Sequence, residues 1–430
     1  MMRSIFKIKV LMLCMGMFFM LDEVQGKPYP SAANAWPAWK GVLEGKRVGL
    51  VIHRSSTIGG RLMPEVLLEE GVDVRMIFVP EHGLRVDFEA GATVGDHVDA
   101  VTGLPVVSLY GKRKGPEPTH TDSLDIIVFD LQDVGVRFYT YLSTLHYVME
   151  ACSRASITLL VLDRPNVNDY TVDGPVLDPS YKSFVGMHPI PVMHGMTMGE
   201  LALMIKGEGW SKSASSLNLQ VWKMQDYQRG LRLQPPIPPS PNLRDSMALE
   251  WYPTLCFLEG CPVSIGRGTV SPFTVMGSPW FSRTDTCFVP ISIPGRSVKP
   301  LYMNQICCGI SMHTLMNDQK RLTVNLQSGL RIELLQWAYR DYTRKRRSNS
   351  RFLASALRNW SKAIPQEANS SAALPKEFFD PFFDLLAGGP SLRVAMTKGH
   401  SAAKIRGSWK PELMKFRKLR STYLLYPDLD

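Results

Sequence analysis

The sequence predicts an α/β protein with two parts: an open, mainly parallel sheet in the first half of the chain and a smaller α+β domain in the second. Three observations predict it. Short apolar runs alternate with helix-like stretches up to about residue 210, a proline-rich segment follows at 234–242, and the pattern then becomes mixed. Regular strand–helix alternation is typical of open α/β sheets, and a proline-rich segment can be neither helix nor central strand. We therefore place one domain at 27–244 and a second at 245–430.

Five runs in the first half are predicted to be strands. They are short, rich in β-branched residues and almost continuously apolar, as expected for parallel strands that are buried on both faces. They span 47–53, 72–79, 104–110, 124–131 and 157–164.

Three stretches near these runs are predicted to be helices. Residues 62–71 close on Gly71 as a helix C-cap would, and 138–155 have apolar residues at helical spacing. The third stretch, 196–210, begins with Thr197 and Glu200 at the spacing of a capping box.

The N-terminus is predicted to be a signal peptide, residues 1–26. A basic start precedes an apolar stretch too short for the roughly 20 residues that span a bilayer, and Gly26 offers a small residue at a cleavage point. A buried N-terminal helix is the alternative, and Leu13 is bulky where a lipoprotein would have a small residue before Cys14. We expect an exported, periplasmic protein with no stable membrane insertion after cleavage.

The charge of the chain limits the classes of binding partner that we expect. The formal net charge is +10, which suits an anionic polymer such as a cell wall and equally suits plain solubility. The basic segments 340–347 and 415–420 lack interleaved aromatic platforms, so we expect no nucleic-acid partner.

Six cysteines follow the predicted signal peptide. An even number in an oxidising compartment permits disulfides, and Cys256 with Cys261 is one candidate pair. Buried free thiols are the alternative, because a chain of this length does not need disulfides to hold its core.

Polar residues gather where four predicted strands end. Ligands of open α/β sheets bind beyond the carboxyl ends of the strands, so these residues are site candidates. Any one group could be a turn or a helix cap, Asp133 in particular, but four together predict a site. The groups are His53 to Ser56; Glu81 and His82; Asp130, Gln132, Asp133, Arg137, Tyr139 and Tyr141; and Asp163, Arg164 and Asn166.

The kind of chemistry is narrowed by missing motifs. No glycine-rich phosphate loop follows a strand, and no GxSxG turn is present, which argues against dinucleotide, P-loop and serine-hydrolase sites. A cleft of carboxylates, amides, arginine and tyrosine suits a sugar, with Glu81 as general acid. A metal held by Glu81, His82 and Asp130 is the alternative. The role of His82 stays open between orienting Glu81, contacting substrate and filling space.

Thirteen collinear motifs between about residues 45 and 426 resemble the exo-β-N-acetylmuramidase family typified by NamZ. They include "PEHGLR", "GATVGD", "DLQDVGVRFYTY", "LDRPN", "HGMTMGELA", "PPSPN", "WYPTLCFLEG" and "KGHSAAKI". The resemblance implies a Rossmann-like N-terminal domain, a smaller C-terminal domain and a site in the cleft between them. It also implies removal of N-acetylmuramic acid from the non-reducing end of peptidoglycan fragments, with no metal or organic cofactor.

Carried over motif by motif, the resemblance assigns Glu81 as the catalytic glutamate. The catalytic group around it comprises His82, Asp130, Gln132, Asp133 and Tyr139, and the substrate-binding candidates are His53, Arg137, Tyr141, Arg164, Asn166, His194, Asn242, Glu259 and Arg267. The lactyl carboxylate of muramic acid calls for a guanidinium, for which Arg137 and Arg267 come first and Arg164 third. Arg267 could instead serve only a turn in "GRGT".

The chain departs from the family pattern at four places. His53 and Arg54 stand in a segment that usually reads "TNHTG", Val167 replaces a proline, Cys261-Pro262 replaces Thr-Asn, and Val270 stands where an acid is common. The departures put substrate preference in doubt and keep a non-enzymatic, sugar-binding paralogue as an alternative. The choice between retention and inversion depends on the separation of two carboxylates in space.

Overall fold

The structure is a computed structural model that describes residues 29–85, 95–212, 214–281, 285–317, 329–347 and 374–429. The expected signal peptide, 1–26, lies outside these ranges. None of the helices in the described ranges combines the length and the apolar character needed to cross a membrane.

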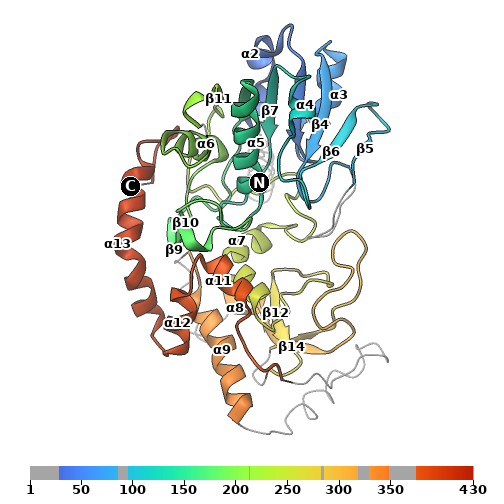
Figure 1. The fold of residues 1–430 in the computed structure, drawn as a ribbon. Helices are drawn as coiled ribbons and strands as arrows, with labels where there is room; N and C mark the ends of the chain where they lie inside the picture. The colour runs from blue at the N-terminus through green and yellow to red at the C-terminus, as the bar shows by residue number, and fades with distance from the viewer. Residues whose placement is uncertain are drawn as a thin grey trace, which may run out of the picture.

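A seven-stranded sheet forms the upper half of the molecule in Figure 1. The strand order is β11-β8-β7-β1-β4-β6-β5, and only the edge strand β5 is antiparallel to its neighbour. This order is that of a Rossmann-like fold: successive strands are added on one side of β1 up to β6, and then on its other side from β7 onward. The strands are β1 (Val48–Ile52), β4 (Val74–Val79), β5 (His97–Val98), β6 (Pro105–Ser108), β7 (Ile126–Asp130), β8 (Thr158–Leu162) and β11 (Leu219–Trp222).

All five predicted strands are confirmed within a few residues of their expected ends. They are buried along almost their whole length, which is why their sequences show no alternation of polar and apolar residues. Strand β11 was not predicted, because its four residues are partly exposed at the sheet edge and carry a weaker apolar signal.

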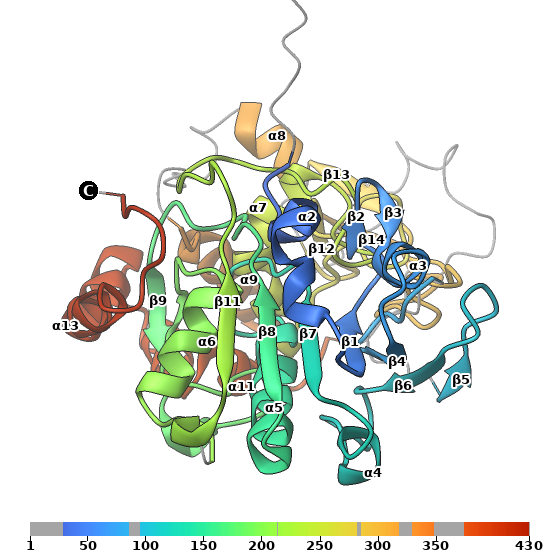
Figure 2. The same ribbon diagram turned by 90° about the horizontal axis from the view of Figure 1, so that it is seen from above.

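The sheet is covered on both faces, as Figure 2 shows from above. Val51 and Phe129 point into the larger core beneath helices α5 and α6, and Leu50 and Val128 point into the second core on the opposite face. The covering elements are α5 (Tyr141–Ala155) and α6 (Met198–Gly207) on the first face, and η1 (Ala32–Ala35), α2 (Trp36–Trp39), η2 (Lys40–Leu43) and α3 (Met63–Glu69) on the second.

The predicted capping box at the start of α6 is present. The Thr197 side chain accepts a hydrogen bond from the Glu200 N–H at 3.3 Å, and the Glu200 carboxylate accepts one from the Thr197 N–H at 2.9 Å. Two N–H groups at the start of the helix are thereby satisfied, which fixes where α6 begins.

The second half of the chain has a small antiparallel sheet, β12-β14-β13, surrounded by helices. Its strands are β12 (Val275–Ser278), β13 (Thr286–Phe288) and β14 (Cys307–Ser311), and its helices are α7 (Ser246–Leu255), η5 (Cys256–Gly260), α8 (Met312–Asn317), α9 (Ile332–Arg347), α11 (Pro381–Ala387), α12 (Ser391–Thr397) and α13 (Ala402–Arg420). Smaller elements in the first half are β2 (Thr57–Ile58), β3 (Arg61–Leu62), α4 (Pro118–Thr121), β9 (Asp173–Val176), η3 (Pro179–Tyr181), β10 (Pro191–Met193) and η4 (Ala214–Ser216).

The end of the chain returns to the first half. Helix α13 runs along the side of the molecule in Figure 1, and the residues around its end attach to the sheet domain. Arg420 donates to the Gly195 carbonyl at 2.9 Å, and the Tyr426 hydroxyl donates to the buried Asp163 carboxylate at 2.7 Å. The domain boundary after residue 244 stays a prediction.

The proposed disulfide between Cys256 and Cys261 is wrong. Both are buried free thiols at the two ends of η5: the Cys256 sulfur faces Glu259 and the Cys261 sulfur faces the Phe257 carbonyl, each at 3.9 Å. The disulfide joins Cys287 on β13 to Cys308 on β14, which are paired directly across the two strands.

Candidate active site

A pocket of about 750 Å³ lies between the two halves of the chain. The first half contributes the turn after β4, Tyr110 after β6 and the segment before α5, and the second half contributes α7, η5 and the loops between 263 and 301. The predicted cleft therefore forms at the carboxyl ends of strands, with the second domain as its opposite wall.

Glu81 is placed in this pocket by the turn that follows β4. The Gly83 N–H donates to the Pro80 carbonyl at 3.4 Å, and the Glu81 carboxylate accepts a hydrogen bond from the Thr140 hydroxyl at 3.0 Å. Thr140 is the N-cap residue of α5, so the carboxylate faces the positive end of a 15-residue helix. Both contacts stabilise the negative charge of Glu81.

Tyr110 lies on the other side of Glu81. Its hydroxyl interacts with the Glu81 carboxylate, and burial together with that negative charge raises the pKa of the phenol above its ordinary value. Tyr110 therefore stays protonated and remains available as a hydrogen-bond donor. Lys114 lies over the rings of Tyr110 and Phe184, at 5.0 and 4.0 Å from their centroids.

His82 also lines the pocket, in an unusual backbone conformation. Its φ angle is +79°, a left-handed value that a non-glycine residue rarely adopts, and its side chain is almost fully buried. Such strain is maintained only where the surrounding structure imposes it, and it is frequent at functional sites. The geometry supports the prediction that His82 belongs to the site without deciding between its possible roles.

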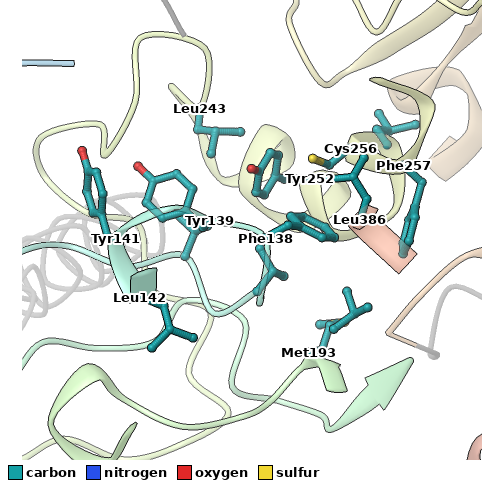
Figure 3. Close-up of a cluster of buried hydrophobic side chains, with 14 of the residues drawn as sticks. Phe138, Tyr139, Tyr141, Leu142, Met193, Leu243, Tyr252, Cys256, Phe257 and Leu386 are labelled. Atoms are coloured by element: carbon teal, nitrogen blue, oxygen red, sulfur yellow. The ribbon is translucent and has the colours of Figure 1, made fainter. Parts of the chain in front are cut away.

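Aromatic residues form the floor between Glu81 and the second domain. Figure 3 shows Tyr139 and Tyr141 side by side with their hydroxyls pointing the same way, while Phe138 points toward Tyr252. The Tyr139 hydroxyl donates to the Pro239 carbonyl at 2.9 Å, and that of Tyr141 is 3.3 Å from the Glu81 carbonyl. Tyr139 faces the pocket as predicted, whereas Tyr141 supports the Glu81 turn from below.

The wall from the second domain carries an ion pair. Arg267 donates to the Glu259 carboxylate at 2.6 and 2.8 Å, and both residues line the pocket, as predicted. Burial disfavours the charged guanidinium, but the negative charge of Glu259 outweighs that cost and holds the pKa of Arg267 above its ordinary value. Arg296 and Lys299, which were not predicted, line the same wall.

Four predicted site residues fill the crevice between β1 and β7 instead of the pocket. Arg164 pairs with both oxygens of the fully buried Asp130, at 2.5 and 2.8 Å, and donates to the Ser55 carbonyl. The Gln132 N–H donates to Nε2 of His53, and burial holds the pKa of that histidine well below its ordinary value. The predicted catalytic roles of Asp130 and Gln132 and the substrate contacts of His53 and Arg164 are therefore corrected to structural ones.

Gln132 is enclosed by its own contacts as well. Its amide donates to the carbonyls of Asp133 and Pro165, and its oxygen accepts from the Tyr29 hydroxyl at 3.0 Å. In most Rossmann-like proteins this switch point is the ligand crevice. Here side chains of the protein itself occupy it, so the pocket lies beyond β4 and β6.

Asp133, His194 and Asn166 are also buried away from the pocket. Burial raises the pKa of Asp133 to about 7 and lowers that of His194 to about 3, so both are neutral over a wide pH range. The His194 Nε2 atom is 3.9 Å from the Asp133 carboxylate. The Asn166 side chain packs on Gly135, where a Cβ atom would come within 1.8 Å of its oxygen. The predicted catalytic role of Asp133 and the predicted substrate contacts of His194 and Asn166 are corrected to packing roles.

Arg137 does not provide the expected lactyl contact. It is fully buried and donates to three backbone carbonyls, those of Pro175, Ile190 and Leu386, at 2.7, 2.7 and 2.9 Å. Burial without a carboxylate partner lowers its pKa to about 9. Because Leu386 belongs to α11, Arg137 joins the two halves of the molecule beneath the pocket.

Asn242 holds the wall of the pocket without facing it. Its side-chain amide donates to the Arg296 carbonyl at 2.9 Å. The predicted substrate contact becomes a positioning role for the loop that carries Arg296 and Lys299.

The ligand set of the metal alternative is not brought together. Both oxygens of Asp130 are engaged by Arg164, and Asp130 does not line the pocket that Glu81 and His82 line. Across the described ranges, no group of three histidine, cysteine, aspartate or glutamate residues has the arrangement of a metal site.

Sequence reasoning missed several polar residues of the pocket, among them Tyr110, Thr140, Arg296 and Lys299. Tyr110 ends a predicted strand, so the strand-end rule could have found it, and Thr140 lies inside the quoted "DLQDVGVRFYTY" motif. Arg296 and Lys299 lie in "PGRSVKP", a turn-rich stretch that gives no signal of facing a cleft.

A pocket that lies between a Rossmann-like domain and a second domain and is lined by Glu81 and Glu259 carries the pair of carboxylates that glycoside hydrolases use. The chain matches the model of the N-terminal part of the exo-β-N-acetylmuramidase NamZ family over residues 48–247 and that of the C-terminal part over 250–426. The chain therefore belongs to this family of glycoside hydrolases.

Similar proteins extend over nearly the whole chain. The peptidoglycan β-N-acetylmuramidase NamZ of Bacillus subtilis is 33% identical over 408 residues, which are 91% of this chain and 89% of that protein. A solved DUF1343 family structure from Bacteroides fragilis superposes with a TM-score of 0.77 at 36% identity, covering 93% of this chain and 99% of the other. A second from the same organism has a TM-score of 0.71 at 27% identity, with the same coverage.

Proposed function

We propose that this protein releases N-acetylmuramic acid from the non-reducing end of peptidoglycan fragments. The observation that carries the proposal is that Glu81 and Glu259, from different halves of the chain, line one pocket floored by aromatic residues. Two carboxylates facing a shared sugar site are the usual equipment for cleaving a glycosidic bond. The activity in the name of the Bacillus subtilis relative supports the choice of substrate.

In the proposed reaction, Glu81 donates its proton to the glycosidic oxygen as the bond from that oxygen to the anomeric carbon breaks. The Thr140 hydroxyl and the N-terminus of α5 stabilise the carboxylate that remains. Glu259, held in place by its ion pair with Arg267, stabilises positive charge on the sugar ring. Water then supplies hydroxide to the anomeric carbon, and its second proton restores Glu81.

Arg267 is our candidate for the lactyl carboxylate, because it is the predicted guanidinium that faces the pocket. Its planar fork can bind two oxygens at once, and Glu259 already holds it in place. In Arg267→Lys we expect KM to rise much more for a muramic substrate than for a simple N-acetylglucosaminide. An equal change for the two substrates would place lactyl recognition elsewhere.

Glu81→Gln tests the proposed function directly. We expect release of muramic acid from a chromogenic β-muramide to fall by roughly 10²–10⁴-fold, the range for loss of a general acid. The melting temperature should not change, and the exposed Glu44→Gln should behave as wild type in both measurements. Full activity of the Glu81 variant would remove the assignment.

Two further measurements separate the alternatives. Loss of activity on adding EDTA, restored by a divalent cation, would support a metal-dependent hydrolase. Binding of muramyl saccharides without turnover would support a sugar-binding paralogue.

We also propose that the protein is exported and acts in cell-wall turnover or muramic acid salvage. N-terminal sequencing of the protein from the periplasmic fraction should then give a sequence that begins near Lys27.

A further inference from the structure

Two loops of the second domain lie beside the pocket, and residues 296–301 of the longer loop line it. Large apolar side chains are exposed along these loops: Val270 is 89% exposed, Leu301 48% and Ile291 45%. The loops are packed against each other, since the Ile291 N–H donates to the Gly268 carbonyl at 2.8 Å and Pro300 lies against Gly268. We call residues 268–271 and 289–303 the lip.

Two basic residues of the lip face the pocket. Arg296 and Lys299 both line it, and neither has an ion-pair partner in the parts of the chain that the structure describes. Arg267, deeper in the same wall, is already paired with Glu259. The lip therefore combines exposed aliphatic surface with positive charge that is not neutralised by the protein.

The lip is also held in place. The Cys287–Cys308 disulfide joins the strands on either side of its longer loop, and Asn242 fixes the Arg296 carbonyl. A surface fixed at its base needs little ordering when a ligand binds, which favours affinity.

We propose that the lip binds the continuing glycan chain of the substrate, beyond the sugar that is released. The proposal rests on the proposed function. An exo-acting enzyme encloses only the terminal muramic acid, so the rest of the chain must leave through the mouth of the pocket. In a chain that alternates N-acetylglucosamine with muramic acid, the next lactyl carboxylate lies two sugars farther out.

The chemistry of the lip matches that chain. Arg296 and Lys299 suit the outer lactyl carboxylate, and the exposed aliphatic side chains suit the C–H faces and acetamido methyl groups of the sugars. A pocket of about 750 Å³ has room for more than one sugar ring. We therefore expect glycan chains, rather than disaccharides, to be the preferred substrates of the enzyme.

The test compares a disaccharide with a tetrasaccharide, each ending in non-reducing muramic acid and free of peptide. We expect the wild-type enzyme to have a higher kcat/KM on the tetrasaccharide. In the double variant Arg296→Gln/Lys299→Gln, that preference should fall about tenfold, the scale of one charge-assisted hydrogen bond. The kcat/KM on the disaccharide should fall by less than that on the tetrasaccharide.

Matched controls come from helix α13, none of whose residues line the pocket. Lys410→Gln/Lys415→Gln removes the same charge from another exposed surface and should leave the preference intact. Val270→Asp tests the apolar part of the lip and should lower the preference, whereas Met414→Asp, at a side chain 70% exposed on α13, should not. Esterifying the internal lactyl carboxylate of the tetrasaccharide should reproduce the effect of the double variant.

Equal rates of wild-type enzyme on the two substrates, or an unchanged preference in the double variant, would overturn the proposal. So would sedimentation with phosphatidylglycerol vesicles that is lost in the double variant while the preference stays intact, since the lip would then face a lipid surface. If the wild-type enzyme releases no muramic acid from either substrate, the proposed function itself fails.

Discussion

Asp133→Asn should remove the part of the pH dependence of the free energy of unfolding that comes from this carboxyl. Asp133 is fully buried with a pKa raised to about 7, against an ordinary value of 3.8 when the chain is unfolded. A raised pKa means that the folded state favours the protonated carboxyl. The stability that this carboxyl contributes is complete below about pH 4 and is lost as the pH rises through 7.

The size of the effect follows from the two pKa values. Each pH unit between them costs about 1.4 kcal/mol, so between pH 5 and pH 8 the wild-type protein should lose about 3 kcal/mol through this group. The asparagine variant cannot ionise and should not show that loss. Titratable groups that are distant from Asp133 are the same in both proteins and cancel in the difference.

Urea unfolding followed by circular dichroism at pH 5 and pH 8 measures the difference. We expect the stability of Asp133→Asn relative to wild type to be about 3 kcal/mol higher at pH 8 than at pH 5, whatever constant offset the amide introduces. If the two proteins show parallel pH dependence, Asp133 is ionised throughout and the reasoning from its burial is refuted.

Three further predictions follow from single contacts. Arg137→Met removes the side-chain donor of three buried carbonyls, of which that of Ile190 keeps another donor, the Leu177 N–H, and should lower the free energy of unfolding by at least about 2 kcal/mol, with no change in KM for the protein that remains folded; an unchanged urea midpoint would contradict its structural role. Thr140→Val and Tyr110→Phe each remove a hydroxyl that contacts the Glu81 carboxylate, so kcat should fall by roughly tenfold while the melting temperature stays within a few degrees; an unchanged kcat in both variants would count against these contacts. Cys287→Ser/Cys308→Ser frees the base of the lip, so KM for the tetrasaccharide should rise with little change for a chromogenic muramide; equal KM values in the variant and the wild type would argue that the loops need no such support.

The sequence predicted the fold class well because its signal is local. A strand buried on both faces must be apolar along its length. The five such runs in the sequence are the five strands that lie between the two edge strands, β11 and β5. The same rule could not find β11, whose half-exposed residues lack that signature.

Within the site, the strand-end rule located Glu81 correctly and Asp130 incorrectly. Both follow buried strands, and nothing in their neighbouring residues distinguishes them. The difference comes from Arg164, which arrives from the end of β8 to neutralise Asp130, and from Tyr29, which closes over Gln132. No local sequence pattern indicates contacts between residues that are so far apart in the chain.

The arginines show the same limit of prediction from local sequence. A guanidinium is equally suited to a substrate carboxylate and to a set of backbone carbonyls, and only the packing decides which one it meets. Arg267 meets the pocket, whereas Arg137 is enclosed by β9, β10 and α11.

The segment from Tyr29 to Leu43, which covers one face of the sheet, has a consequence for the order of events during synthesis. Its partner residue Gln132 lies 103 positions farther along the chain, and the Ala32 N–H donates to the carbonyl of Asp163, which is later still. At about 5–20 residues per second, a ribosome needs roughly 5–20 s to make the chain that separates Tyr29 from Gln132. During that time Trp36 and Trp39 can pack only on β1, β4 and β6, so this segment stays incompletely attached until β7 and β8 have been made.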